Sequence, residues 1–298
     1  MAVHGAIDHL AATLASVHAQ TLAGVEGGME VVIVDDGNTP EDRDRLLSHT
    51  KGDARIRVIH NDKNVGLTRS LIRACQHARA DYIARIDCGD LMVPRTRLEE
   101  QVELLRANPD VVLIAGGLEV VDCVNRRRYR SRYQDCIRVQ ARQFERYRIR
   151  FPHVTVMFKK DAYFRSGGYA PGARVGQDSE LWPRLLQQGD AISVGTVYAI
   201  APMRARSISV AENRRQILGK IGRVWRQASG SQNTWSAWLR TVPKVLSEVV
   251  KLGLPTGLRI TLRYRRHYDA VGTVTEHECN SLEALSASYG FGEIDLRW

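Results

Sequence analysis

Cysteine is scarce in this chain, and no two cysteines are closely spaced. The five are Cys75, Cys88, Cys123, Cys136 and Cys279, with no C-x-x-C pair among them. Closely spaced pairs mark most structural zinc sites, and dense cysteine frameworks mark small secreted domains, so both classes are disfavoured. The simplest interpretation is a cytosolic protein with reduced thiols.

Long apolar runs are also missing. No stretch approaches the ~20 consecutive apolar residues that a membrane-spanning helix needs. The first residues, MAVHGAIDHLAATLASVHAQ, contain neither a basic leader nor a long apolar core, so no secretory signal is visible. These absences favour a cytoplasmic location.

Acidic residues are sparse in two segments of a chain whose formal net charge is +10. Residues 126–150 hold ten Arg against two carboxylates, and residues 204–266 hold 14 Lys and Arg against two carboxylates. Such basic segments attract polyanions, namely nucleic acid, anionic lipid or a phosphorylated substrate.

Strand and helix patterns alternate over the first 115 residues. Helices are expected where apolar residues recur at helical spacing, at 6–22, 39–51, 65–80 and 94–110. Strands are expected where short β-branched runs meet turn residues, at 29–38, 54–61, 81–87 and 111–117. Thr39 as N-cap and Pro40 at the first position open the second helix. The alternation predicts an α/β fold with a largely parallel sheet flanked by helices.

From residue 118 the pattern changes. The expected elements are a hairpin or extended segment, a basic helix, a strand and a helix, at 118–133, 139–149, 154–160 and 175–189. Pro183 must lie near the start of the last of these helices or kink it. After about residue 205 no strand pattern is convincing, and two helices are expected, at 212–228 and 234–253.

Four carboxylates stand where two of the expected strands end. Asp35 and Asp36 close the first apolar run, and Asp87 and Asp90 follow the third strand. In open α/β sheets, ligands bind at the carboxyl ends of the strands. These carboxylates are therefore the first candidates for a binding site.

Five motifs follow one another along the chain. They read VVIVDDGN, NDKNVGLTRSL, ADYIARIDCGDLMVPRTRLEEQ, HVTVMFKKDAYFRSGGY and GQDSELWPRLLQQG. In this order and spacing they resemble the inverting family 2 glycosyltransferases, which have the GT-A nucleotide-sugar-binding fold. The resemblance covers roughly residues 1–209 and leaves 210–298 as a basic helical extension. It implies transfer of a sugar from a nucleotide-diphospho-sugar to an acceptor hydroxyl, in the synthesis of a cell-surface polysaccharide or glycoconjugate.

The resemblance places the donor nucleotide at the strand ends. In the family the V-D-D-G strand end recognises the base and ribose, which here implicates Asp35 and Asp36. The alternative for Asp36 is an Asp-Gly turn in which its side chain bonds its own backbone. The other donor positions implied by the resemblance are Ala2, Val3, His4, Gly66 and Asp87, with Arg204 on the diphosphate.

The metal position departs from the family pattern, which is Asp-x-Asp-Asp. This chain reads Asp87-Cys88-Gly89-Asp90, so Gly89 stands where the family usually ligates a divalent cation, Mn²⁺ or Mg²⁺. Three alternatives stay open: Asp90 takes over the metal, Asp87 does so, or the cation depends mainly on phosphate oxygens. The non-functional reading of Asp90 is the N-cap of the helix that follows.

Catalysis is assigned by the resemblance to Asp178, as the general base that deprotonates the acceptor hydroxyl. The family has Glu-Asp where this chain has Gln177-Asp178, and the alternative for Asp178 is to cap its helix. The acceptor-side residues implied are His153, Gly168, Tyr169 and Trp182. For His153, a packed and hydrogen-bonded core position is the alternative.

The two ends of the chain add further expectations. MAVHG resembles only the end of the family's first strand, so a stunted strand or a recorded start downstream of the true one is expected. The basic, Trp-containing stretch 234–267 suits either peripheral contact with an anionic membrane or packing on the catalytic domain.

Expected partners are the nucleotide-sugar donor and a glycan or lipid-linked acceptor, with no nucleic acid. A catalytically degenerate nucleotide-sugar binder and, less favoured, a nucleic-acid-binding protein are the alternatives.

Overall fold

The computed structural model describes most of the chain. It covers residues 1–204 apart from 6, 26, 133–135, 148 and 174–175, then residues 242, 246, 249–250 and 253–289 apart from 266. The helices expected at 212–228 and 234–253 therefore lie almost wholly outside the described residues. Among the residues described, no helix combines the length and apolar character that crossing a bilayer requires.

Three parallel strands form a small sheet in the N-terminal part. Their order is β1-β2-β3, and they are β1 (Ala2–Val3), β2 (Val31–Asp36) and β3 (Ile56–Asn61). In the central strand, Ile33 packs against the cluster that contains Leu10, whereas Val34 packs with Ala74. Both faces of β2 are thus covered, which explains its nearly continuous apolar run.

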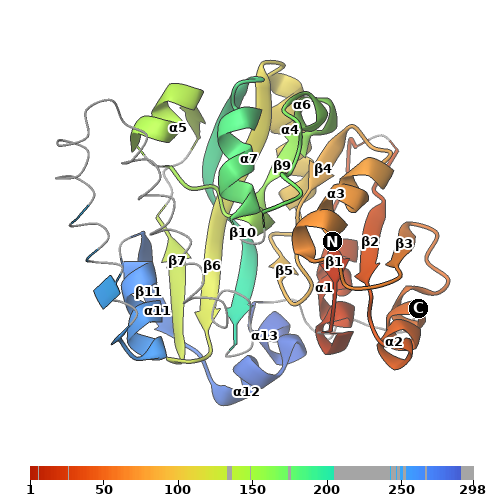
Figure 1. Ribbon diagram of the computed structural model, residues 1–298, viewed down its shortest axis with the longest axis vertical. Coiled ribbons are helices and arrows are strands. Elements are labelled where there is room, and N and C mark those ends of the chain that lie inside the picture. Colours follow the sequence, from red (N-terminus) through yellow and green to blue (C-terminus); the bar gives the residue numbers. More distant parts are fainter. Residues whose placement is uncertain are drawn as a thin grey trace.

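Helices connect these strands as the sequence predicts (Figure 1). They are α1 (Leu10–His18), preceded by the 3-10 turn η1 (Ile7–His9), α2 (Pro40–Thr50) and α3 (Leu67–His77). Thr39 caps α2, because its hydroxyl accepts from the Asp42 N–H at 3.3 Å. The predicted cap and the predicted N1 proline are confirmed.

A larger sheet of eight strands forms the rest of the framework. Its main path runs β11-β7-β6-β10-β5, with β9 joining β6 to β4 and β8 pairing with β10. The strands are β4 (Tyr82–Ala84), β5 (Leu91–Met92), β6 (Val111–Asp122), β7 (Arg127–Ser131), β8 (Ile137–Val139), β9 (Met157–Lys159), β10 (Asp190–Met203) and β11 (Tyr268–Thr273). β6 and β10 run parallel, and the other described pairs of this sheet are antiparallel.

Further helices pack around the larger sheet. They are α4 (Arg97–Ala107), α5 (Ala141–Tyr147), α6 (Lys160–Arg165), α7 (Gln177–Leu185), α11 (Thr256–Arg265), α12 (Glu276–Asn280) and α13 (Leu282–Ser288), with the 3-10 turn η2 (His153–Thr155) before β9. The predicted α/β class is confirmed, as are the β6–β7 hairpin and the basic helix α5. The largely parallel pairing expected from the sequence is found in β1-β2-β3 and between β6 and β10, whereas the remaining described pairs of the larger sheet are antiparallel. Two predicted strands are much shorter than expected, since β4 and β9 have three residues each.

The sequence patterns missed four strands, the short β5 and β8 and the longer β10 and β11. β10 is an apolar strand of 14 residues for which no strand was expected, and it pairs with β6 along most of its length. β11 corrects the expectation that no strand follows residue 205: it pairs with β7, and all its residues but Tyr268 are exposed. An exposed edge strand carries no alternating pattern, so its pairing was not readable locally. Beyond it, Leu282 and Leu285 pack with Leu91 of β5.

Candidate active site

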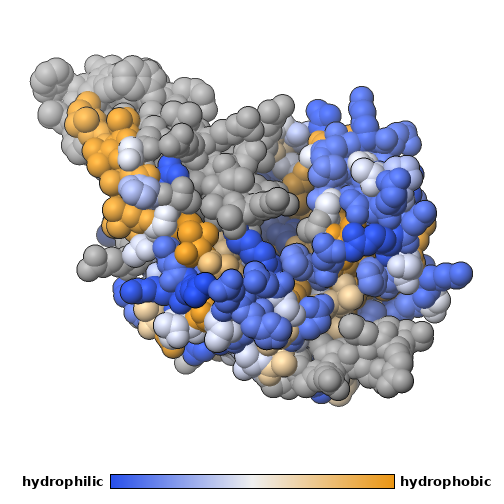
Figure 2. All heavy atoms as spheres, turned by 90° about the horizontal axis from the view of Figure 1, so that it is seen from below, coloured by the Kyte–Doolittle hydropathy of each residue, from blue (hydrophilic) through white to orange (hydrophobic). Residues whose placement is uncertain are grey.

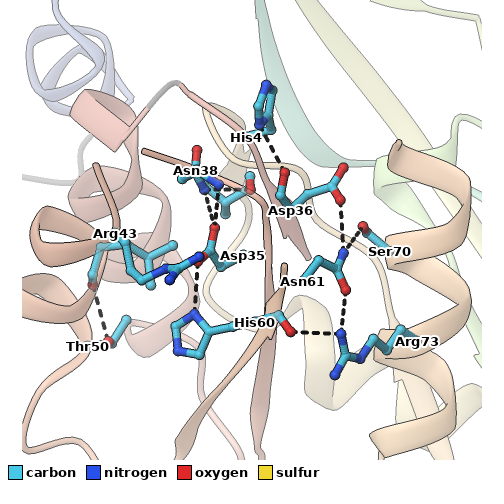
Figure 3. A network of polar contacts seen from close by, with 12 residues as sticks. His4, Asp35, Asp36, Asn38, Arg43, Thr50, His60, Asn61, Ser70 and Arg73 are labelled. Atoms are coloured by element: carbon cyan, nitrogen blue, oxygen red, sulfur yellow. Dashed lines mark hydrogen bonds and ion pairs between the residues drawn. The ribbon is translucent and has the colours of Figure 1, made fainter. Parts of the chain in front are cut away.

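Asp35 and Asp36 end β2 inside a dense polar network (Figure 3). Asp35 is fully buried and accepts hydrogen bonds from Asn38 Nδ2 at 2.6 Å, Arg43 Nε at 2.8 Å and His60 Nδ1 at 2.8 Å. Burial opposes ionisation, but these hydrogen bonds, that of His60 foremost, lower the pKa of Asp35 to about 2. Its oxygens are occupied by the protein, so Asp35 acts as a scaffold for the strand end.

Asp36 binds the loop between β3 and α3. Its carboxylate accepts from Asn61 Nδ2 at 2.9 Å, Val65 N at 2.9 Å and Gly66 N at 3.0 Å, and the residue is 3% exposed. The alternative in which Asp36 bonds back to its own turn is therefore wrong. Gly66 has φ +90°, a conformation that suits glycine, and begins α3. Asp36 thus sets the position of the Gly66 loop, which the family resemblance places against the donor.

Gly37 allows direct contact between the turn that follows β2 and the loop that follows β3. A Cβ atom at Gly37 would lie 2.3 Å from the backbone N of Asn64, closer than any real contact, and φ is +68°. Only glycine therefore allows the turn after β2 to rest on the loop after β3.

The first strand presents one accessible side chain to this edge. Val3 is 1% exposed and Ala2 is half-buried, whereas His4 is exposed and its Nδ1 lies 3.0 Å from the backbone O of Asp36. Asn38 ties the strand end down by donating to the Val3 carbonyl at 2.9 Å. Of the three predicted positions, His4 is the one whose side chain a ligand can reach directly.

Asp87 follows β4 and belongs to a second buried network. Arg85 Nη2 donates to Asp87 Oδ1 at 2.5 Å, and Arg85 Nε donates to His153 Nε2 at 3.2 Å. The His153 Nε2 also lies 2.7 Å from the Tyr169 hydroxyl. Burial opposes ionisation of Asp87, but the Arg85 charge and, to a lesser extent, His153 hold its pKa below the ordinary value. Burial, reinforced by Arg85, lowers the pKa of His153 to about 4, so its imidazole is neutral near pH 7.

Gly89 leaves no carboxylate at the family's metal position. Its φ is +98°, and its N–H donates to Thr13 Oγ1 at 2.9 Å, so the backbone itself requires glycine here. A Cβ at this position would face the His9 side chain at 3.8 Å.

Asp90 is the remaining candidate for a cation. β5 follows it directly, and α4 begins only at Arg97, so the helix N-cap alternative for Asp90 is wrong. Burial and the nearby charge of Asp87 raise its pKa, while Arg85 and Arg204 act in the opposite direction. No group of three potential metal-binding His, Cys, Asp or Glu side chains occurs within the described part of the chain. One or two carboxylates plus phosphate oxygens and water are nevertheless an ordinary ligand set for Mg²⁺, and Asp90 fits that smaller set.

Asp178 is the second residue of α7 and is half-buried. Gly176, with φ +74°, occupies the N-cap position without a side-chain hydrogen bond, so the cap alternative for Asp178 is wrong. Burial is the main cause of the lowered pKa of His153 and of the raised pKa of Tyr169, and the Asp178 charge slightly offsets the first and slightly adds to the second. Trp182, on the same helix as Asp178, packs against the His153 ring. A half-buried carboxylate beside this network is able to receive a proton from a bound hydroxyl.

The predicted acceptor-side residues are mostly supports. Tyr169 and Trp182 are each 2% exposed, Trp182 Nε1 donates to the Phe151 carbonyl at 3.2 Å, and its ring meets that of His153 at a centroid distance of 6.0 Å. Gly168 has φ +61° and no room for a side chain, because a Cβ would lie 2.7 Å from the Tyr163 ring. Tyr169 and Trp182 pack against the His153 ring, and all three predicted residues, Gly168 included, are buried.

Arg204 follows β10 and reaches the Asp90 side of the site. Its Nε donates to the Cys279 carbonyl at 2.9 Å, and its charge lowers the pKa of both His9 and Asp90. The predicted diphosphate residue and the metal candidate therefore influence each other electrostatically.

Arg85 is the main residue that the sequence reasoning missed. It stands between Ala84 and Ile86 in YIARID, and a charged residue inside such a short apolar run was the available signal. Buried charges are rare unless they are paired, so a buried arginine at this position would have predicted a carboxylate close to it.

Comparison with solved structures agrees with this architecture. The structure of S. aureus TarS 1-349 matches with a TM-score of 0.56 and 12% identity over 83% of this chain and 69% of that one. TarS 1-349 in complex with UDP matches with a TM-score of 0.56 and 10% identity over 85% of this chain and 74% of that one. At these identities the likeness shows the fold alone, an α/β fold of the GT-A type, as predicted.

The sequence itself identifies the family. The family model described as glycosyl transferase family 2 matches residues 1–174, more than half of the chain, so the chain belongs to that family. Relatives include the amylovoran biosynthesis glycosyltransferase AmsE of Erwinia amylovora, 26% identical over 62% of this chain and 67% of the relative. The O-antigen biosynthesis glycosyltransferase WbnJ of Escherichia coli is 26% identical over 63% and 70%. The chain spans 57 to 67% of the lengths of three of its curated relatives.

Proposed function

We propose that this chain is an inverting glycosyltransferase that moves a sugar from a nucleotide-diphospho-sugar to an acceptor hydroxyl. The observation that carries the proposal is the convergence of two carboxylates on one histidine. Asp87, after β4, is joined to His153 through Arg85, which bonds to both. Asp178 is in the first turn of α7, whose Trp182 ring packs against the same His153 ring. A donor-side carboxylate and an accessible base in one neighbourhood suit a displacement between two bound substrates.

In the proposed reaction, Asp178 removes the proton from the acceptor hydroxyl. The hydroxyl oxygen attacks the anomeric carbon, and the bond from that carbon to the diphosphate breaks with its electron pair staying on the nucleotide. Attack from the face opposite the leaving group inverts the anomeric configuration. A base in this role contributes roughly 10²- to 10⁴-fold to the rate.

The donor is proposed to lie across the carboxyl ends of β1, β2 and β4. The Asp87 side chain is 34% exposed and His4 is exposed, so both are accessible to a nucleoside. Asp36 acts from beneath by holding the Gly66 loop, and Arg204 is proposed to pair with the diphosphate. The TarS structure named above contains UDP, which makes UDP the first nucleotide to test.

A divalent cation, Mn²⁺ or Mg²⁺, is proposed to bind through Asp90 together with phosphate oxygens of the donor. Such an ion would neutralise the negative charge that develops on the leaving diphosphate. The His9 side chain, at the end of the 3-10 turn η1, lies beside Gly89 and bounds this position.

The acceptor is proposed to be a glycan or a lipid-linked sugar, and the protein to act on the cytoplasmic face of a membrane. AmsE is named for amylovoran biosynthesis and WbnJ for O-antigen biosynthesis. Of the eleven large hydrophobic side chains that are exposed in the described part of the chain, seven lie between residues 242 and 271. Figure 2 shows hydrophobic atoms gathered at one corner of the molecule. Together with the basic residues of 204–266, this segment suits peripheral contact with anionic lipid.

Calorimetric titration with UDP and GDP, each with and without Mn²⁺, tests the donor site. Wild type is expected to bind one of the two nucleotides, and Asp90→Ala to lose the part of the affinity that Mn²⁺ adds. If neither nucleotide binds in any condition, the proposal fails.

Asp178→Asn tests the chemistry, with Asp161→Asn as a matched control. Asp161 is likewise the second residue of a helix, α6, but it pairs with Arg165 on the surface. We expect Asp178→Asn to bind nucleotide like wild type and to lose transfer by roughly 10²- to 10⁴-fold, whereas Asp161→Asn retains both. A wild type that binds nucleotide but transfers no sugar would instead support the degenerate alternative.

A further inference from the structure

Arg85 lies between the two halves of the candidate site. Its side chain is 4% exposed, yet it bonds both to Asp87, on the donor side, and to His153, on the acceptor side. Arg85 and His153 are 68 positions apart in the sequence, so the arginine joins two segments that only folding brings together.

The backbone of Arg85 is itself held on both sides. Its N–H donates to the Val156 carbonyl at 3.0 Å, and its carbonyl accepts from Nη2 of the fully buried Arg97 at 3.0 Å. The guanidinium is planar and presents its donors in a rigid fork. A fixed backbone and a rigid fork together define where the Asp87 and His153 side chains point.

The polarity of the hydrogen bonds defines the state of His153. A guanidinium N–H only donates, so His153 Nε2 must accept and carries no proton. The ring proton is then on Nδ1, and the Tyr169 hydroxyl donates to the same Nε2 at 2.7 Å. His153 is therefore a neutral acceptor that orients Tyr169, and it is not the proton carrier.

We infer that Arg85 is a positioning residue that sets Asp87 and the His153–Tyr169 pair in one geometry. This inference rests on the proposed function, because it assigns Asp87 to the donor and His153 to the acceptor. Because the Arg85 side chain is buried, a substitution of Arg85 affects the two substrates only through Asp87 and His153. Its loss should weaken donor binding and turnover together.

The test compares Arg85→Lys and Arg85→Met with Arg130→Met. Arg130 also pairs with a buried carboxylate, Glu119 at 2.9 Å, but both residues lie in the β6–β7 hairpin. With UDP, or GDP if only GDP binds, Arg85→Met is expected to raise Kd and to lower kcat, each about 10- to 100-fold. Arg85→Lys keeps the charge but not the fork, so an intermediate loss is expected, while Arg130→Met stays near wild type.

A spectroscopic readout separates positioning from a general structural role. In ¹⁵N NMR, His153 is expected as the Nδ1–H form in wild type and to shift toward the Nε2–H form in Arg85→Met. If wild type binds neither nucleotide, the proposed function fails. If wild type binds and turns over, and both Arg85 variants match Arg130→Met in Kd and kcat, the inference on Arg85 is overturned.

If neither Arg85 variant folds, a double-mutant cycle of Asp87→Asn and His153→Gln tests whether Arg85 couples these two residues. Urea unfolding free energies that are not additive support Arg85 as the shared partner of the two residues. Additive values overturn the inference.

Discussion

Asp36→Asn distinguishes a scaffolding carboxylate from one that binds the donor directly. In the structure both oxygens of Asp36 accept hydrogen bonds from the protein, from Asn61, Val65 and Gly66 at 2.9–3.0 Å. Asparagine keeps one acceptor and replaces the other with an NH₂ group, which faces the Gly66 N–H donor. We therefore expect this change to destabilise the folded protein, and not only to weaken ligand binding.

The magnitude follows from the hydrogen bonds that change. A buried donor that loses its partner costs about 1–3 kcal/mol, and the two remaining hydrogen bonds lose the assistance of the carboxylate charge. A total loss of about 2–4 kcal/mol in the free energy of unfolding is expected. Nucleotide affinity should fall as well, because the Gly66 loop loses its anchor.

Urea unfolding followed by circular dichroism measures this loss. Asp44→Asn is the control, since Asp44 is exposed on α2, and surface changes of this kind stay within about 0.5 kcal/mol. If Asp36→Asn unfolds at the same urea concentration as Asp44→Asn while nucleotide binding disappears, Asp36 is a ligand-binding residue and the scaffold reasoning is refuted.

Three further predictions concern other parts of the site. Gly37→Ala should give little folded protein or a loss of several degrees in Tm, because its Cβ would meet the Asn64 backbone at 2.3 Å; soluble yield and thermal unfolding measure this. The pKa of His153 is lowered to about 4, so its contribution to stability is complete above pH 6.5 and is lost as pH falls toward 4, by up to about 1.4 kcal/mol per pH unit. Urea midpoints between pH 4.5 and 7.5 should show a shallower decline for His153→Gln than for wild type. Arg204→Gln should weaken UDP binding about tenfold and leave uridine binding unchanged, because the proposed contact is with the diphosphate; equal losses for both ligands would contradict that contact.

Local signals sufficed for much of the N-terminal fold. Thr39 and Pro40 predicted the start of α2, and VVIVDD predicted a buried strand that ends in carboxylates. The order of five motifs implied the GT-A fold and the family, both of which the comparisons support. These patterns are reliable because a helix cap, a proline at the first helical position or an apolar run determines the local structure of its immediate neighbours in the sequence.

The same local reasoning failed where a residue's role depends on a distant partner. Asp90 was read as a possible helix N-cap, but a short strand follows it, paired with β10 about a hundred residues later. β11 was missed because it is an exposed edge strand that pairs with β7, a strand about 140 residues earlier in the chain. Asp36 turned out to anchor the Gly66 loop, which no spacing within VVIVDDGN could indicate.

The sequence by itself determined the family, the class of fold and the set of carboxylates from which a site could be built. Only the tertiary structure decided which of them have their oxygens bound by the protein's own donors, and it revealed Arg85 as the link between Asp87 and His153. The physical reason is that hydrogen-bond partners and burial are properties of surfaces assembled from remote segments. The sequence alone does not distinguish an aspartate whose oxygens accept hydrogen bonds from the protein's own N–H groups from one whose oxygens remain accessible to a substrate.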